Sequence, residues 1–301
     1  MRILLPTWLR VPLATLVSVV NTVLHVTPLL LVAAVKALIP LRAVRSACNY
    51  VLISIAASWI AINTALIKLL TRTDIRVDLH AQLRKDGHYL VLANHQSWVD
   101  IPVLQAVFNR RIPFLRFFLK SQLFWVPLLG LAWWALDFPF MKRYSKEVLA
   151  KHPELAGRDI EATRRACAKF RHIPVSMMNF VEGTRFTTTK HRLQESPFLH
   201  LLRPKAGGVA FVMDALGDAL HAILDVTIVY PSGHSTLADL IGDRIGEVRV
   251  HVRELAIPAE LVHGDYASDP AARERMQSWI NTLWAEKDLR IAELRRTPSA
   301  P

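Results

Sequence analysis

The 301-residue sequence predicts an α/β domain that follows a helical, membrane-associated segment. Short apolar runs typical of buried strands alternate with helix-like stretches over most of the chain, and this alternation indicates the α/β class. The first 70 residues differ, because they hold two long apolar runs that contain no charged side chain. We therefore place the membrane-associated segment at residues 1–70 and a second domain at residues 71–301.

The two apolar runs are residues 11–35 and 47–67. Each is long enough for a bilayer-spanning helix, which needs about 20 apolar residues. Polar residues, among them Asn21, His25 and Asn63, interrupt the runs and leave a shallow hairpin open beside two full spans. Basic residues flank both runs on every side, so the positive-inside rule favours neither orientation, and we prefer the hairpin. The first run is too long for a cleaved signal peptide.

The first element expected in the second domain is an apolar run at residues 89–93, which is typical of a buried strand. Residues 100–108 follow as a helix, with Pro102 in the first turn, where a missing N–H costs little. The same reasoning predicts strands at residues 117–119, 175–181 and 223–230, and helices at residues 159–170 and 207–216.

The last part of the chain predicts one strand and one long helix. Val248, Val250 and Val252 alternate with polar residues, which is the pattern of a half-exposed strand. Residues 270–296 form a charged helix with an apolar side made of Trp279, Ile280, Leu283 and Trp284.

Composition narrows the class of partner. The chain is 52% hydrophobic with a mean hydropathy of +0.25, a net charge of +12 and a pI near 10.1. Basic surfaces attract anionic lipid head groups, acidic carrier proteins or nucleic acid. The apolar segment favours lipid, and since the sequence has no recognised nucleic-acid motif, we expect no nucleic acid as partner. The two cysteines, Cys48 and Cys167, indicate neither a disulfide framework nor a metal site.

His95 and Asp100 are the candidate catalytic pair. His95 comes just after the strand at residues 89–93, and Asp100 begins the next helix. A carboxylate held against one imidazole nitrogen fixes the tautomer and leaves the other nitrogen free as a general base. The alternative is a histidine bonded for structure beside an aspartate that caps the helix. Ser97 lies nearby, but the sequence has no G-x-S-x-G nucleophile elbow.

A second candidate element is the turn Glu182-Gly183-Thr184-Arg185, after the strand at residues 175–181. Glycine lets backbone amides approach an anion closely, and the Arg185 fork can hold two phosphate oxygens. Glu182 cannot bind phosphate, so we expect it to orient Arg185 or a turn amide. The alternative is a tight turn with a surface arginine.

Two further residues stand beside apolar stretches. Lys120 precedes a run rich in Leu, Phe and Trp, which suits a ligand with a charged head and an apolar tail. The alternative is a lysine that reaches to the membrane surface. Residues 226–231 look like a core strand that ends at Pro231, with a role in packing or in shaping an acyl pocket.

Four ordered blocks resemble those of the glycerolipid acyltransferase family: residues 94–100, 118–120, 180–185 and 226–231. More narrowly, the chain is similar to a proteobacterial inner-membrane branch of probable acyltransferases related to lysocardiolipin-type enzymes, which shares the stretch at residues 134–144. The resemblance covers nearly the whole chain. It implies an α/β fold with a mixed sheet flanked by helices, behind a two-helix membrane element.

The resemblance also implies site roles. His95 would deprotonate the acceptor hydroxyl and Asp100 would orient His95. Lys120 and Arg185 would bind the acceptor phosphate, in a site that Glu182, Gly183 and Thr184 shape, and Pro231 would bound the acyl region. The match around Lys120 is partial. No metal and no organic cofactor are expected.

The implied function is O-acyl transfer from acyl-CoA or acyl carrier protein to a lysophospholipid in phospholipid biosynthesis, most simply 1-acyl-sn-glycerol-3-phosphate to phosphatidic acid. The location implied is the bacterial inner membrane, with the domain at residues 71–301 as a catalytic domain that faces the cytoplasm. Lysophosphatidylglycerol and lysocardiolipin remain open as acceptors. A non-catalytic lipid-binding protein and a membrane-bound acyl hydrolase remain open as other classes.

Overall fold

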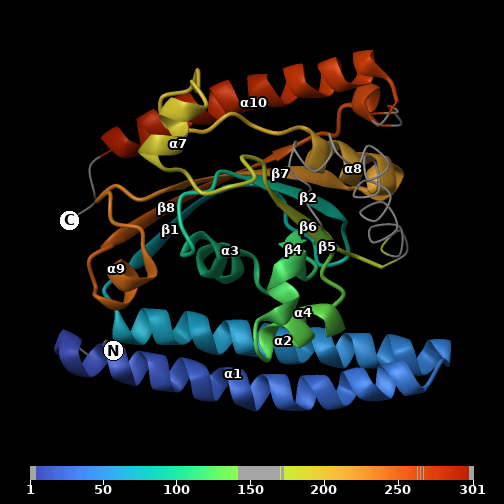
Figure 1. Cartoon of the computed structure of the whole chain (residues 1–301), viewed down its shortest axis with the longest axis vertical. Coiled ribbons are helices and arrows are strands. Elements are labelled where there is room, and N and C mark those ends of the chain that lie inside the picture. The colour runs from blue at the N-terminus through green and yellow to red at the C-terminus, as the bar shows by residue number, and fades with distance from the viewer. Residues whose placement is uncertain are drawn as a thin grey trace, which may run out of the picture.

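A computed structural model of the chain describes residues 5–141, 170, 173–262, 264, 266 and 268–297. Within these residues, six strands form one mixed sheet in the order β1-β8-β7-β2-β6-β3 (Figure 1). The pairs β1–β8, β2–β7, β2–β6 and β3–β6 are parallel, and β7–β8 is antiparallel. The six strands are β1 Asp74–His80, β2 Tyr89–Ala93, β3 Leu115–Phe117, β6 Ser176–Phe180, β7 Ala222–Val229 and β8 Glu247–Leu255.

Helices cover both faces of the sheet, and β2 shows how the layers are bound together. Tyr89, Val91 and Ala93 pack toward α3 (Asp100–Phe108) and the N-terminal helices, whereas Leu90 and Leu92 pack toward α8 (Gly207–Leu216) and α10 (Pro270–Arg296). All five side chains are fully buried. A strand in the middle of a sheet with helices on both faces is apolar throughout, which explains the uninterrupted run in the sequence.

The two N-terminal helices, α1 (Thr7–Leu38) and α2 (Arg42–Leu70), lie side by side along one side of the molecule (Figure 1). Helix α1 contacts α4 (Leu129–Ala135) and α9 (Leu237–Ile241), and α2 contacts α3. Both are long and apolar enough to cross a membrane. Polar groups in their apolar runs join the helices: Asn21 Nδ2 donates to Asn63 Oδ1 at 2.8 Å, and His25 Nε2 lies 3.2 Å from Ser58 Oγ.

Most elements expected in the second domain are confirmed. The strand at residues 89–93 and the helices at residues 100–108, 207–216 and 270–296 have the bounds predicted, and β6 and β7 shift by one residue at their ends. Short helices also occur as η1 (Ser121–Trp125), α7 (Thr188–Leu193), η3 (Gly217–Ala219) and η4 (Ala259–Leu261). The helix expected at residues 159–170, with Cys167, lies almost entirely outside the described residues, as does the end of the stretch at residues 134–144.

The single strand expected at residues 117–119 is wrong. Strand β3 ends at Phe117, and β4 (Leu119–Lys120) belongs to a separate two-stranded sheet with β5 (Phe140–Met141). The Leu119 amide donates to the Pro139 carbonyl at 2.9 Å, so the chain leaves the edge of the main sheet after Phe117 to meet residues that are remote in sequence.

The half-exposed pattern expected for β8 is also wrong. Arg249 and His251, on its polar side, are 6% and 5% exposed. The C-terminal end of α10 covers this side, and the Arg249 guanidinium donates to the carbonyls of Leu294 and Thr297 there. Strand β1, which the sequence did not predict, pairs with β8 and places Asp78 opposite His251.

Candidate active site

The four sequence blocks meet at one edge of the sheet. Strands β3, β6, β2 and β7 are neighbours and all run parallel, so their carboxyl ends lie along the same edge. His95 follows β2, the Glu182 turn follows β6, and Pro231 follows β7. Lys120 comes three residues after β3 and is exposed. Parallel strand order therefore brings together residues that lie far apart in the sequence.

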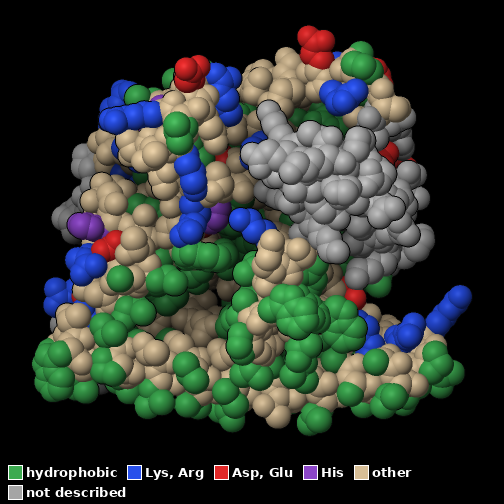
Figure 2. Space-filling model, viewed as in Figure 1, with side chains coloured by type: hydrophobic (Ala, Val, Ile, Leu, Met, Phe, Trp, Pro, Cys, Tyr) green, Lys and Arg blue, Asp and Glu red, His purple; other side chains and the backbone are tan. Residues whose placement is uncertain are grey.

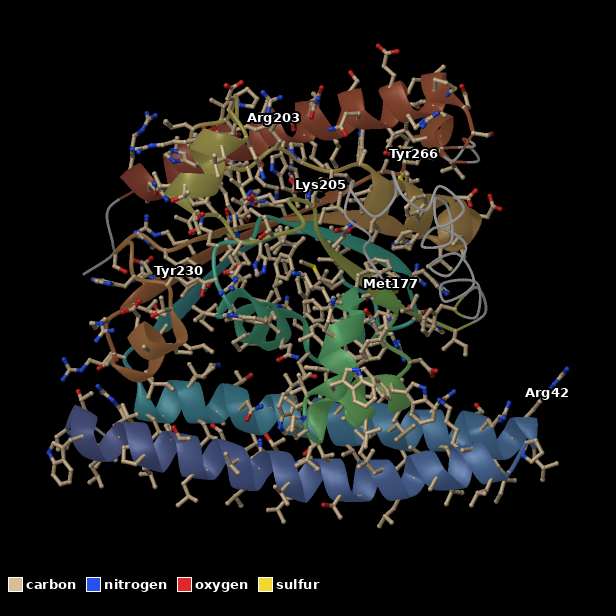
Figure 3. All side chains as sticks on the ribbon, viewed as in Figure 1. Arg42, Met177, Arg203, Lys205, Tyr230 and Tyr266 are labelled. Carbon is tan, nitrogen blue, oxygen red and sulfur yellow. The ribbon has the colours of Figure 1, made fainter. Side chains whose placement is uncertain are left out.

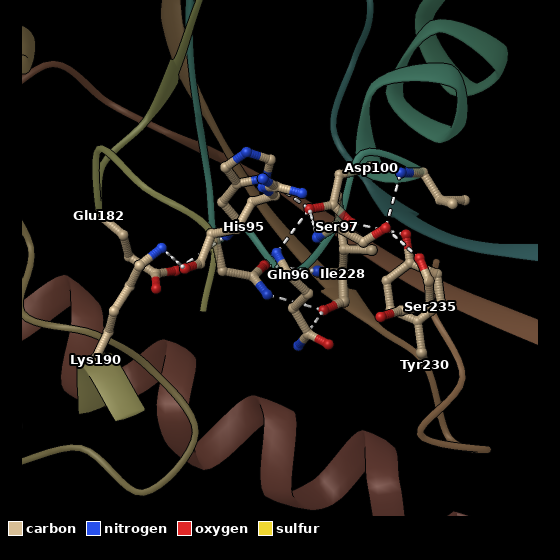
Figure 4. Close-up of polar contacts among 12 residues, drawn as sticks. His95, Gln96, Ser97, Asp100, Glu182, Lys190, Ile228, Tyr230 and Ser235 are labelled. Carbon is tan, nitrogen blue, oxygen red and sulfur yellow. Dashed lines mark hydrogen bonds and ion pairs between the residues drawn. The ribbon is translucent and has the colours of Figure 1, made fainter. Parts of the chain in front are cut away.

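Asp100 anchors His95 through one carboxylate oxygen (Figure 4). His95 Nδ1 lies 2.8 Å from Asp100 Oδ2, which also accepts the N–H groups of Gln96 at 2.7 Å and Ser97 at 2.9 Å. Asp100 is fully buried. Because an ionised carboxylate only accepts hydrogen bonds, the Nδ1 proton belongs to this contact and Nε2 carries the free lone pair. The arrangement is that of an imidazole prepared to take a proton at Nε2.

The imidazole of His95 is held on one flat side as well. Its ring stacks on Phe180, the last residue of β6, with centroids 3.9 Å apart and planes inclined by 14°. The His95 side chain is 13% exposed, so only a small part of the ring reaches solvent. Packing and hydrogen bonding together leave the ring little freedom to turn.

Glu182 does not act as the sequence led us to expect. Its carboxylate accepts the His95 amide at 3.0 Å through Oε1 and the Leu202 amide at 3.1 Å through Oε2, and no contact with Arg185 is seen among the described residues. It is 1% exposed, and burial raises its pKa to about 8, against the lowering effect of the two amide bonds; the nearby Asp100 raises it further. Glu182 thus ties the turn after β6 to the backbone of the loop at residues 94–99, which carries His95 and is called the histidine loop below.

Gly183 allows the chain to reverse at this point. Its φ is +68°, in the left-handed region that favours glycine, and its N–H donates to the Phe180 carbonyl at 2.8 Å. One residue beyond the turn, the Phe186 amide donates to the His95 carbonyl at 2.8 Å. The histidine loop is therefore bonded on both its N–H and its C=O to the segment that carries the turn.

Arg185 lies against the histidine loop. Its guanidinium carbon is 4.8 Å from the ring centroid of Trp98, a residue between His95 and Asp100 that is 47% exposed. Lys190 Nζ donates to Thr184 Oγ1 at 2.7 Å and to the Arg185 carbonyl at 3.0 Å. Arg185 and Lys190 thus place two cations beside the His95–Asp100 pair, hereafter the dyad, and such a setting suits an anionic group.

The space-filling view agrees with a basic rim over an apolar wall. Figure 2 shows Lys, Arg and His side chains gathered above a hollow on this face, with hydrophobic side chains below it and along the N-terminal helices. Pro231, which follows β7, is half-buried.

Sequence reasoning missed two residues that the structure brings to the site. Tyr230, expected to pack, donates its hydroxyl to Asp100 Oδ1 at 2.7 Å. Lys190 has no signal in the sequence beyond its place in a basic stretch of α7 soon after the turn. Ser97, by contrast, donates its hydroxyl to the Ser235 carbonyl and accepts the Val99 amide, so it is engaged in the loop rather than with His95.

One group of metal-ligating side chains lies elsewhere. Among the residues that the structure describes, Asp78, His80 and His251 bring three possible donor atoms within 4.8 Å of one another, on the β1–β8 side of the sheet. Asp78 and His80 are exposed. This group shares no residue with the dyad.

A mixed α/β sheet with a buried histidine–aspartate pair at the carboxyl edge of its parallel strands defines a class of proteins equipped for general-base chemistry. The chain belongs to the acyltransferase family, whose model matches residues 74–232, more than half of the sequence. That span begins with β1 and ends just after Pro231, so it takes in all four blocks at the sheet edge.

Individual relatives agree with this family. The chain is 25% identical over 258 residues to lysocardiolipin acyltransferase 1 of Danio rerio, covering 81% of this chain and 61% of the relative. It is 28% identical over 216 residues to 1-acyl-sn-glycerol-3-phosphate acyltransferase gamma of Homo sapiens, covering 67% and 52%. The chain thus spans roughly half to three-fifths of the length of these curated relatives.

A solved structure has the same fold. The 1-acyl-sn-glycerophosphate acyltransferase PlsC of Thermotoga maritima superposes with a TM-score of 0.58 at 17% identity, covering 98% of this chain and all of that one. The expected class, a mixed sheet flanked by helices behind two N-terminal apolar helices, is confirmed.

Proposed function

We propose that the protein transfers a fatty acyl group from a thioester to the free hydroxyl of a lysophospholipid. The observation that carries the proposal is the 2.8 Å contact between His95 Nδ1 and the buried Asp100, which leaves Nε2 as the proton acceptor. The relatives act, by their names, on lysocardiolipin and on 1-acyl-sn-glycerol-3-phosphate, and these give the acceptor class. We take 1-acyl-sn-glycerol-3-phosphate as the first acceptor to test.

The reaction follows from the dyad. His95 Nε2 takes the proton of the acceptor hydroxyl as its oxygen attacks the thioester carbonyl carbon. The C–S bond breaks, an ester forms, and the imidazolium returns the proton to the departing thiolate sulfur. Asp100 stabilises the imidazolium while it carries the proton, and general-base assistance of this kind contributes roughly 100- to 10,000-fold.

The acceptor phosphate is assigned to the basic group beside the dyad. Arg185 supplies a planar fork, braced against Trp98 at 4.8 Å, and Lys190 adds a second charge held at Thr184. Lys120, exposed after β3, is the third cation assigned to this phosphate. A phosphate fixed here positions the adjacent hydroxyl at Nε2, which is the entropic part of the catalysis.

The donor is acyl-CoA or acyl carrier protein, both anionic partners for a chain of charge +12. The proposed chemistry uses only protein groups, so we expect activity without a metal ion or organic cofactor. Full activity after dialysis against a chelator agrees with this, whereas a requirement for added metal contradicts it. We place the enzyme on the bacterial inner membrane with its catalytic domain in the cytoplasm.

We propose that the helical hairpin lies along the membrane surface and does not span it. Helices α1 and α2 contact the catalytic domain at several points along their length, a position incompatible with crossing the bilayer away from that domain. Exposed leucines recur on α1 at positions 16, 24, 31 and 38, which is one outward face. This face can sink into one leaflet.

Arg42, at the tip of the hairpin (Figure 3), tests this position. In a chain from which Cys48 and Cys167 have been removed, Arg42→Cys should react with an impermeant maleimide from the same membrane side as a single cysteine placed in the catalytic domain of a second, otherwise cysteine-free variant. Labelling from the opposite side would show two full spans.

The test of the reaction uses purified protein in detergent with a radiolabelled acyl-CoA and 1-acyl-sn-glycerol-3-phosphate. We expect His95→Ala to lose at least about 100-fold in kcat. His221→Ala is the matched control, because His221 is exposed before β7 at the opposite edge of the same sheet. Activity of His95→Ala near that of the control would refute the mechanism.

Two outcomes would assign another class. Free fatty acid released in the absence of acceptor would indicate a hydrolase, and lipid binding without turnover across acyl donors would indicate a lipid-binding protein. Lysophosphatidylglycerol and lysocardiolipin in parallel assays identify the preferred acceptor.

A further inference from the structure

Tyr230 is the last member of a series of hydrogen bonds that runs from His95 through Asp100. Its hydroxyl donates to Asp100 Oδ1 at 2.7 Å, and Asp100 Oδ2 meets His95 Nδ1 at 2.8 Å (Figure 4). Tyr230 stands one residue after β7, and Asp100 stands 130 positions earlier in the chain. His95 and Tyr230, the two ends of this series of hydrogen bonds, therefore follow different strands of the sheet, β2 and β7.

The two oxygens of Asp100 are unequally supported. Oδ2 accepts three donors: the His95 ring and the amides of Gln96 and Ser97. Within the part of the chain that the structure describes, Oδ1 accepts the Tyr230 hydroxyl alone. Since Asp100 is fully buried, removing this hydroxyl would leave one carboxylate oxygen without a partner or solvent.

We propose that Tyr230 is a positioning residue for the acyl transfer, which fixes the ionised Asp100 carboxylate in the rotamer that holds His95. The proposal rests on the proposed function, since it assigns a role within that reaction. Tyr230 is 2% exposed and packs in the core beneath the sheet, so it touches no substrate and acts through Asp100.

The hydroxyl is a dependable donor at this place. Burial raises the pKa of Tyr230 well above its ordinary value, and the adjacent Asp100 charge raises it further. Tyr230 therefore keeps its proton throughout the range in which the enzyme works and cannot become a second anion beside Asp100.

The titratable groups that face Asp100 are His95 from the loop after β2, Tyr230 from the end of β7, and Glu182 from the turn after β6. Tyr230 stabilises the carboxylate form by donating to it. Without that bond the Asp100 carboxylate is free to leave the rotamer that holds His95, and the imidazolium formed during transfer loses part of its stabilisation. The acid limb of the kcat profile, which marks loss of the imidazolium proton, then moves to lower pH.

Tyr230→Phe keeps the ring and removes only the oxygen. Tyr89→Phe is the matched control, because Tyr89 is also fully buried and its hydroxyl accepts the Arg84 amide at 2.9 Å, at the opposite end of β2. We expect Tyr230→Phe to lower kcat by about ten- to a hundredfold, the range for one hydrogen bond to a charged group. The KM for the acceptor should stay within about twofold, because the phosphate site is untouched.

Asp100→Asn provides the coupling measurement. If Tyr230 acts through the carboxylate, adding Tyr230→Phe to Asp100→Asn should lower kcat little further. A readout independent of turnover is the rate at which diethyl pyrocarbonate modifies His95 as a function of pH. Its midpoint should move downward in Tyr230→Phe and remain in place in Tyr89→Phe.

The outcomes are distinct. Unchanged kcat, pH limb and modification midpoint in Tyr230→Phe, with an active wild type, would overturn this inference and leave the proposed function standing. Equal losses in Tyr230→Phe and Tyr89→Phe would reduce the effect to general destabilisation and overturn it as well. A wild type without transferase activity would refute the proposed function, while the modification midpoints would still report whether Tyr230 controls His95.

Discussion

Replacing Glu182 by Gln distinguishes two roles for the Glu182 carboxyl group, support of the His95 backbone and orientation of Arg185. Both carboxylate oxygens accept a backbone N–H, from His95 at 3.0 Å and from Leu202 at 3.1 Å. A glutamine amide has one acceptor oxygen and one donor NH₂, so one of the two amides would face another donor in a buried place. We expect the free energy of unfolding to fall by about 1–3 kcal/mol, the cost of one unsatisfied buried group.

The loss in free energy of unfolding caused by Glu182→Gln should depend on pH. The folded-state pKa of Glu182 is raised to about 8 from an ordinary 4.5, chiefly by burial, so folding takes up a proton between these values. Stability of the wild type is then greatest below about pH 4.5 and falls as pH rises toward 8, by at most about 1.4 kcal/mol per pH unit. Glutamine does not titrate, so the advantage of about 1–3 kcal/mol belongs to the wild type below about pH 4.5, and it should narrow and then reverse in sign as the pH approaches 8.

The assay is chemical denaturation in detergent at several pH values, together with steady-state kinetics. Because Glu182 holds the His95 backbone, we expect kcat to fall while the KM for the acceptor changes little. Glu274→Gln, exposed on α10, is the control for loss of a carboxylate. A raised KM with normal kcat and stability would refute this reasoning and restore the role expected from sequence, orientation of Arg185.

Two further changes test the phosphate site and the buried charge. Arg185→Lys keeps the charge but loses the planar fork and its place over Trp98, so the KM for a phosphorylated acceptor should rise roughly tenfold with little change in kcat, measured by steady-state kinetics. Lys287→Met removes a 1% exposed ammonium that lies 2.5 Å from Asp225 Oδ1, which leaves Arg253 as the remaining cation on that buried carboxylate among the described residues. We expect a loss of about 3–5 kcal/mol, measured by denaturant unfolding.

Each of these changes has its own control. Arg203→Lys alters an arginine that bonds the carbonyls of Gln194 and Glu195, and should leave the KM unchanged. Arg290→Met removes an exposed cation from the same helix as Lys287 and should cost under about 1 kcal/mol. A large kcat loss in Arg185→Lys, or equal stability of the Lys287 and Arg290 variants, would contradict the two assignments.

Local pattern was sufficient for much of the fold. The apolar run of β2 and the amphipathic side of α10 express their burial directly, since helix and strand periodicity are properties of neighbouring residues. The prediction of one strand at residues 117–119 was wrong because Phe117 and Leu119 pair with different strands, β6 and β5. The prediction that the polar side of β8 is exposed was wrong because the end of α10, which covers it, lies about 45 residues further along the chain.

The residues of the candidate site also divide into those that local sequence patterns predict and those that only the fold brings to the site. His95, Asp100, Gly183 and Arg185 could be singled out from sequence because a turn glycine and a histidine after a buried strand carry local signals. Tyr230 could not, since a tyrosine that ends a core strand has packing as its ordinary explanation, and only the fold brings its hydroxyl to Asp100.

The sequence by itself determined the α/β class, the two long apolar helices and the residue types able to move a proton and hold a phosphate, because these depend on short-range periodicity and on side-chain chemistry. Tertiary structure alone decided what those groups touch. Glu182 meets the His95 amide across 87 positions, and Arg185 lies over Trp98 instead of meeting Glu182. Such contacts depend on strand order and packing in the whole fold, which no local pattern of residues encodes.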